Sequence, residues 1–196
     1  MALESTTLTI GGVTHKYYVY RQHDLNNCGP SSIVMLVKQA LKKDIAIGFA
    51  QMLCGKMEKN RGLTTSAEQA DSRWHSWGEG GTTIGWVLLD SLKKKWPKLN
   101  AYENPVYGET VQLKLCTPDK PAICRVKWSN NTGHFIVCLG KSSDKMVYLD
   151  PYYGIVVCSA DSVHSSGGLN YSTANNSFNK GMANGYITYA IFTNPH

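Results

Sequence analysis

The stretch QHDLNNCGPSSIVMLVKQALKK, residues 22–43, joins a clear helix pattern to an unusually placed cysteine. The apolar residues have the i, i+3, i+4, i+7, i+8 spacing of one helix face: Ile33, Leu36, Val37, Ala40 and Leu41. Pro30 suits the first turn, and Lys42 and Lys43 suit the last turn, where cations stabilise the helix dipole. The pattern predicts a helix that begins next to Cys28.

Cys28 lies where a thiolate is stabilised, because the first turn of a helix has unpaired N–H groups and the positive end of the dipole. Its neighbours are Asn, Gly, Pro and Ser, whereas Cys138, inside HFIVCLG, has the surroundings of a small buried apolar residue. Six cysteines in 196 residues are too few for a disulfide scaffold, and no CxxC pair suggests zinc. We expect one reactive thiol and no metal or organic cofactor.

The composition is that of a soluble globular protein, with 42% apolar and 17% charged residues. The length predicts a single domain over residues 1–196. The net charge of +6 comes from scattered lysines without a basic stripe between aromatics, so we expect no nucleic-acid partner. No apolar run is long enough to span a membrane, so we do not expect a membrane to be a partner. The N-terminus lacks a signal-peptide pattern, which predicts a cytoplasmic protein or one exported by specialised machinery.

The helix and strand patterns predict an α+β fold with a helical first half and a mostly antiparallel second half. Residues 8–22 read as a hairpin, and Ile84, Val87, Leu88 and Leu92 indicate a second helix that stops at Trp96-Pro97. Five later strands are expected, at residues 122–128, 134–140, 146–150, 154–160 and 186–192. Residues 55–81 read as polar and irregular. Residues 161–185 read as a long loop that is either ordered by the site it borders or mobile.

His134 and Asp150 are candidate partners for the thiol. His134 begins one expected strand and Asp150 ends the next, so antiparallel pairing through the turn at 141–145 places them side by side. A carboxylate there could fix the imidazole tautomer and stabilise its charged form. Gln22 could donate to the oxyanion that forms when a thiolate attacks a carbonyl, with the Cys28 N–H as second donor, and Asn26 or Asn27 could replace it.

These motifs resemble the papain-like cysteine peptidases. The pattern Q-x5-C-G-P before a helix, followed by GHF-V and YLDP on successive strands, is most similar to the C39-like branch known for processing bacteriocin leaders. The resemblance spans roughly residues 17–157 and implies a papain-like fold in which the nucleophile helix packs on the sheet. It implies Cys28 as nucleophile, His134 as general base and acid, Asp150 as orienting carboxylate and Gln22 as oxyanion residue.

The resemblance implies a peptidase with a protein or peptide substrate. Stand-alone papain-like domains of this size also occur as bacterial effectors and toxins delivered into other cells, and such a role implies a cognate immunity or inhibitor protein. The same triad could instead serve a glutamine deamidase or a transglutaminase-type acyl transferase, because attack on a carboxamide gives the same acyl-enzyme. The non-enzymatic alternative is a binding module with a vestigial triad.

Overall fold

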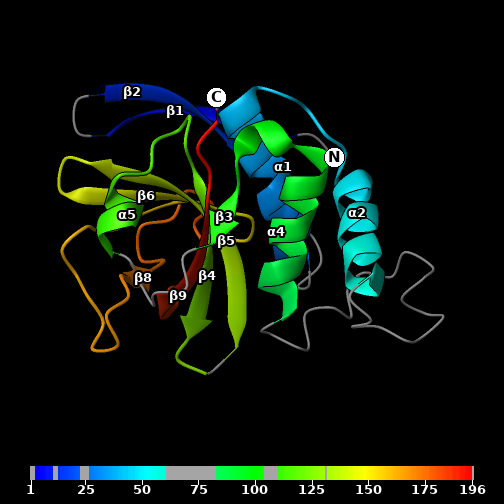
Figure 1. Ribbon diagram of the computed structural model, residues 1–196. Helices are drawn as coiled ribbons and strands as arrows, with labels where there is room; N and C mark the ends of the chain where they lie inside the picture. Colours follow the sequence, from blue (N-terminus) through cyan, green and yellow to red (C-terminus); the bar gives the residue numbers. More distant parts are fainter. Residues whose placement is uncertain are drawn as a thin grey trace.

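Helix α1 (Cys28–Leu41) begins at the predicted cysteine and packs against an antiparallel sheet (Figure 1). The computed structural model describes residues 3–10, 13–22, 27–60, 83–103, 110–130 and 132–195. The helix ends at Lys42, whose left-handed backbone lets its N–H bond to the carbonyl of Lys38 at 3.0 Å. The predicted helix is confirmed.

The main sheet of the described chain has seven strands in the order β3-β9-β4-β5-β6-β7, with β8 alongside β9. Each neighbouring pair is antiparallel. The bounds are Tyr102–Glu103 (β3), Ala122–Trp128 (β4), Gly133–Ser142 (β5), Lys145–Asp150 (β6), Gly154–Ser159 (β7), Asn170–Ser172 (β8) and Asn184–Phe192 (β9). The five predicted strands are therefore confirmed, while β3 and β8 have no counterpart in the sequence interpretation.

The remaining predicted elements are also present. Strands β1 (Glu4–Ile10) and β2 (Val13–Val19) form the N-terminal hairpin. Helix α4 (Thr83–Lys95) ends before the short 3-10 helix η2 (Pro97–Leu99), as the Trp-Pro pair indicates. A further short helix is α5 (Thr110–Lys114). None of the helices described has the length and apolar character needed to cross a membrane.

Helix α2 (Ile47–Asn60) corrects the sequence interpretation, because residues 55–60 were expected to be irregular. Its buried positions have helical spacing: Ala50, Leu53, Cys54 and Met57. Glycines at 48 and 55 and a polar last turn weaken the local helix signal, and packing against α1 and α4 overrides it. The rest of the segment expected to be irregular, residues 61–82, lies outside the described residues.

The sheet separates two apolar cores. Helices α1, α2 and α4 cover one face, whereas α5 and the β8 segment lie on the other (Figure 1). The side chains of β5 alternate between the two: Phe135, Val137 and Leu139 pack in the helix-side core, and Ile136 and Cys138 in the far core. This alternation fixes the register of β5, which begins with Gly133 and His134.

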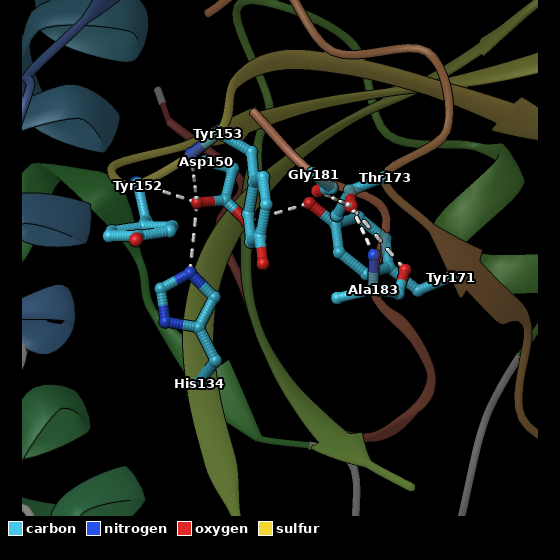
Figure 2. A network of polar contacts seen from close by, with 8 residues as sticks. All are labelled: His134, Asp150, Tyr152, Tyr153, Tyr171, Thr173, Gly181 and Ala183. Carbon is cyan, nitrogen blue, oxygen red and sulfur yellow. Dashed lines mark hydrogen bonds and ion pairs between the residues drawn. The ribbon is translucent and has the colours of Figure 1, made fainter. Parts of the chain in front are cut away.

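The segment expected as a long loop, residues 161–185, is ordered. It contains β8, which pairs with the start of β9. Thr173 is fully buried; its Oγ1 accepts the Ala183 N–H at 2.7 Å and lies 3.3 Å from the Gly181 carbonyl. These bonds close the segment on itself, and the contact of Tyr171 with Asp150 attaches it to the site (Figure 2).

Candidate active site

Cys28 is the first residue of α1 and is half-buried. Asn27 precedes it; its carbonyl accepts the Ser31 N–H at 3.0 Å, and its Oδ1 accepts Nε2 of Gln51 at 2.9 Å. The first turn carries no acidic residue that would offset the positive end of the helix dipole. The side chain of Cys28 is partly buried and packs against the helix-side core.

His134 and Asp150 lie in direct contact, as the register argument predicts. Nε2 of His134 is 2.9 Å from Oδ1 of Asp150. The pairing of Val137 with Leu149 places residue 152 opposite His134 and brings Asp150 diagonally beside it. The imidazole is 6% exposed and the carboxylate is fully buried.

Asp150 is surrounded by hydrogen-bond donors (Figure 2). Its Oδ1 accepts the backbone N–H groups of Tyr152 at 2.7 Å and Tyr153 at 2.9 Å, in addition to His134. Its Oδ2 accepts the hydroxyl of Tyr171 at 2.7 Å. Both carboxylate oxygens are satisfied inside the protein, so the buried charge is stabilised and its orientation is fixed.

The electrostatics favour a charged His134–Asp150 pair. Burial by itself lowers the pKa of His134, but the Asp150 carboxylate and a hydrogen bond with Cys28 outweigh it, and the pKa of His134 is raised from 6.5 to about 10. Burial raises the pKa of Asp150, yet the charge of His134 and the surrounding donors leave that pKa below its ordinary value. The pair is therefore imidazolium and carboxylate at neutral pH.

The structure also brings Cys28 to the imidazole. The hydrogen bond between the thiol and His134 is among the influences that raise the pKa of the ring. Because Asp150 occupies Nε2, the other ring nitrogen, Nδ1, is left for the thiol. Three of the four predicted residues thus form one connected group, which joins the start of α1 to the start of β5 and the end of β6.

Gln22 lies next to this group through its backbone. Its N–H donates to the carbonyl of Pro151, the residue after Asp150, at 2.8 Å. The side chain is buried, and Oε1 has no hydrogen-bond partner among the described residues. The alternative residue Asn27 points its amide oxygen at α2, and Asn26 lies outside the described residues. The oxyanion role of Gln22 stays a prediction.

Two aromatic residues complete the site and are missed by sequence reasoning. Trp128, at the end of β4, stacks on His134 with ring centroids 5.7 Å apart and planes at 24°. It also contacts Tyr171, with ring centroids 5.7 Å apart. The β-pairing of Val126 with His134 could have identified Trp128, which is two residues further on the same face. No local pattern identifies Tyr171, because its contact depends on the path of residues 161–183.

The remaining cysteines, histidines and tryptophans considered in the sequence either lie away from this group or fall outside the described residues. Cys138 is buried, as predicted, and so are Cys54, Cys116, Cys124 and Cys158. Trp86 could on its sequence position alone either wall a substrate cleft or belong to the core; it is 46% exposed on α4, so it is not a core residue. His23, Trp74, His75 and Trp77 lie outside the described residues. The part of the chain that is described contains no group of three or more His, Cys, Asp or Glu side chains that could hold a metal ion.

Comparison with known proteins identifies the fold. No protein-family model and no curated protein matches the sequence. The peptidase domain of Streptococcus ComA, a bifunctional ABC transporter involved in a quorum-sensing pathway, matches with a TM-score of 0.50 and 16% identity, over 92% of this chain and 99% of that one. This similarity confirms the predicted papain-like, C39-like peptidase fold.

Two further solved structures match with TM-scores below 0.5. A double-glycine-motif protease from an AMS/PCAT transporter, in complex with its leader peptide, has a TM-score of 0.49 and 18% identity over 91% of each chain. The Pseudomonas avirulence protein AvrPphB has a TM-score of 0.36 and 14% identity, over 84% of this chain and 91% of that one.

Proposed function

We propose that this protein is a cysteine peptidase that cleaves a protein or peptide substrate with Cys28, His134 and Asp150. The observation that carries the proposal is the position of His134, held by Asp150 at Nε2 and hydrogen-bonded to Cys28. An imidazolium fixed by a buried carboxylate next to a thiol at a helix N-terminus is the arrangement that produces a nucleophilic thiolate. The papain-like fold supports the same reading.

The chemistry follows from these positions. The Cys28 thiolate attacks the scissile carbonyl carbon, and the carbonyl electron pair moves onto oxygen. Gln22 and the Cys28 N–H are the proposed donors to that oxyanion. As the tetrahedral intermediate collapses, His134 transfers its proton to the leaving amine and a thioester remains on Cys28. His134, now neutral, takes a proton from water, and the hydroxide releases the acid and the thiolate.

Asp150 acts on His134 rather than on the substrate. It holds the ring so that Nδ1 faces the thiol, and its charge stabilises the imidazolium before the proton is transferred. The donors from Tyr152, Tyr153 and Tyr171 keep this carboxylate ionised in a fully buried position. No metal or organic cofactor takes part in the proposed steps.

The test has two arms on the purified protein. In the first, iodoacetamide is added at neutral pH and the labelled cysteine is mapped by mass spectrometry. Rapid labelling of Cys28 that is lost in His134→Ala supports the thiolate–imidazolium pair, with His15→Ala as the matched control. Slow labelling of Cys28, unchanged in His134→Ala, would exclude the proposed nucleophile and favour a binding module.

The second arm identifies the reaction. A proteome is treated with the wild type or with Cys28→Ala, and its peptides are compared by mass spectrometry. New chain termini made only by the wild type support a peptidase. Conversion of glutamine to glutamate, or new cross-links at glutamine, would replace it by the deamidase or transglutaminase-type alternative, which the same three residues could serve.

The proposal extends to the setting of the enzyme. A free nucleophilic thiol persists under reducing conditions such as those of a cytosol. If the protein is a bacterial effector or toxin that acts in a target cell, the producing cell needs a cognate inhibitor to protect its own proteins. Affinity purification of the Cys28→Ala variant from the producer tests this: a stoichiometric partner that blocks wild-type activity supports it, and free enzyme contradicts it.

A further inference from the structure

Strand β4 carries two cations on the face that looks toward the helices. Ile123 belongs to the helix-side core, whereas Cys124 and Val126 belong to the far core. Side chains alternate along a strand, so Arg125 and Lys127 lie on the same face as Ile123. Both are half-buried. Because β4 ends at Trp128, beside His134, these two cations lie at the active-site end of the sheet.

The guanidinium of Arg125 lies directly against the residue before His134. Lys127 pairs with Gly133, and Arg125 pairs with Phe135. A Cβ atom added at Gly133 would lie 3.0 Å from one terminal nitrogen of Arg125 and 3.1 Å from its Nε. Cys28 packs against the helix-side core that contains Phe135. The guanidinium and the thiol are therefore on the same side of the sheet, and both lie close to the start of β5.

Most hydrogen-bonding capacity of this arginine is unused. A guanidinium has five N–H donors in a planar fork, and the hydrogen bond that Arg125 makes with its side chain is a long one, 3.4 Å to Oγ1 of Thr188. In the described chain, neither Arg125 nor Lys127 forms an ion pair. The carboxylate of Glu103, on the next strand but one, instead accepts the Tyr189 hydroxyl at 2.7 Å.

A half-buried cation without a counter-ion loses hydration and gains no compensating attraction. Such a residue beside a catalytic group is suited to a ligand that supplies the missing negative charge. The planar fork of arginine binds a carboxylate through two parallel hydrogen bonds, and a second cation two residues away adds attraction for the same sign of charge.

We propose that Arg125, assisted by Lys127, binds a carboxylate of the substrate close to the scissile bond and thereby selects acidic sequences. This inference rests on the proposed peptidase function. The carboxylate comes from an Asp or Glu side chain or from the C-terminus of a peptide. Gly133 contributes by having no side chain, because a Cβ there would press on the guanidinium.

The test profiles cleavage of a proteome-derived peptide library with free or amidated C-termini. For the wild type we expect Asp or Glu to be enriched at one position near the cleaved bond; enrichment only in the free library would assign the carboxylate to the peptide terminus. In Arg125→Gln the preference for a Glu peptide over its Gln counterpart should fall about tenfold, the effect of losing a charge-assisted pair. Lys127→Gln should lower it less.

Lys94→Gln is the matched control, since Lys94 is an exposed lysine at the far end of α4 and its loss gives the same change in net charge. Its acid preference should equal that of the wild type. Arg125→Lys tests the fork separately, because it keeps the charge; an intermediate preference is expected. Cleavage without acid preference, or a preference that Arg125→Gln leaves unchanged, would overturn the inference.

A binding arm separates this inference from the proposed function. The Cys28→Ala variant is incubated with the same library, and retained peptides are counted with and without the additional Arg125→Gln change. Acidic peptides enriched only when Arg125 is present support the carboxylate site even if the wild type produces no new termini. Equal retention of acidic and neutral peptides contradicts the site even if the protein proves to be a peptidase.

Discussion

Nε2 of His134 lies 2.9 Å from Oδ1 of Asp150, although the two residues are sixteen positions apart in the sequence. The antiparallel register of β5 and β6 brings them together, and burial removes the water that would otherwise screen their charges. The contact therefore follows from the strand pairing alone and does not depend on any catalytic role. The charge state of the pair is measurable without knowing a substrate.

The first prediction concerns stability and pH. The pKa of His134 is raised in the folded protein from 6.5 to about 10. Its stabilising contribution is therefore complete below pH 6.5 and is lost as the pH rises to about 10. Each unit of pKa difference corresponds to about 1.4 kcal/mol. We therefore expect the free energy of unfolding to fall by a few kcal/mol, on the order of three to five, as the pH rises across that window and the charged pair is lost.

Asp150 acts in the opposite direction. Its pKa is lowered in the folded protein, so its contribution is present above the ordinary carboxyl pKa and is lost as the pH falls through the folded value. Urea unfolding of the wild type and His134→Gln across pH 3–11 measures both limbs. The difference between the two proteins should shrink toward pH 10, whereas His15→Gln should follow the wild type. A constant difference over the whole range would contradict the charged pair.

The second prediction compares two buried tyrosines whose rings touch, Tyr171 and Tyr148. The Tyr171 hydroxyl donates to Asp150, and Tyr171→Phe should cost about 1.5–3 kcal/mol because it leaves a carboxylate oxygen without its donor. The Tyr148 hydroxyl has no hydrogen-bond partner within the described residues, so Tyr148→Phe should be neutral or stabilising. Chemical denaturation of both variants provides the measurement. Equal losses would mean that Tyr171 acts only through packing.

The third prediction concerns the ring stacked on His134. The electron-rich face of Trp128 stabilises an imidazolium more than a neutral imidazole, an effect of about 0.5–2 kcal/mol. Trp128→Leu keeps an apolar side chain but removes this face, so the pKa of His134 should fall by about 0.4–1.5 units. NMR titration of the His134 ring protons in the two proteins checks this. An unchanged or higher pKa would show that Trp128 only shields the pair.

The sequence allowed helix α1, the hairpin and most of the sheet to be predicted because each has strong local periodicity. The contact of His134 with Asp150 could also be predicted, since two strands and a short turn determine the register. Helix α2 shows the limit of local reading. Its buried residues have helical spacing, but two glycines and a polar last turn obscure a helix that packing against α1 and α4 stabilises.

The surroundings of the site could not be predicted, because they depend on long-range contacts. Tyr171 reaches Asp150 only because residues 161–183 fold back through the bonds of Thr173. Trp128 meets His134 diagonally across two strands, a neighbour that becomes evident only after the exact pairing is known. Sequence motifs identify the predicted site residues, whereas the residues that contact and orient them can be identified only from the tertiary structure.

The fourth prediction concerns the bend of β5 beyond the site. Gly140 has a φ of +88°, between residues where the pairing with β6 changes register, and an added Cβ would collide with the carbonyl of Cys116. Gly140→Ala should therefore cost both backbone strain and a steric shift, roughly 3 kcal/mol or more in the free energy of unfolding. Gly167 has a similar φ of +93° with open space around it, so Gly167→Ala should cost only the strain, about 1–2 kcal/mol. Thermal and urea unfolding of the two variants separate the steric contribution from the conformational one. If both alanines cost the same, the carbonyl of Cys116 moves aside easily and does not hold this bend in place.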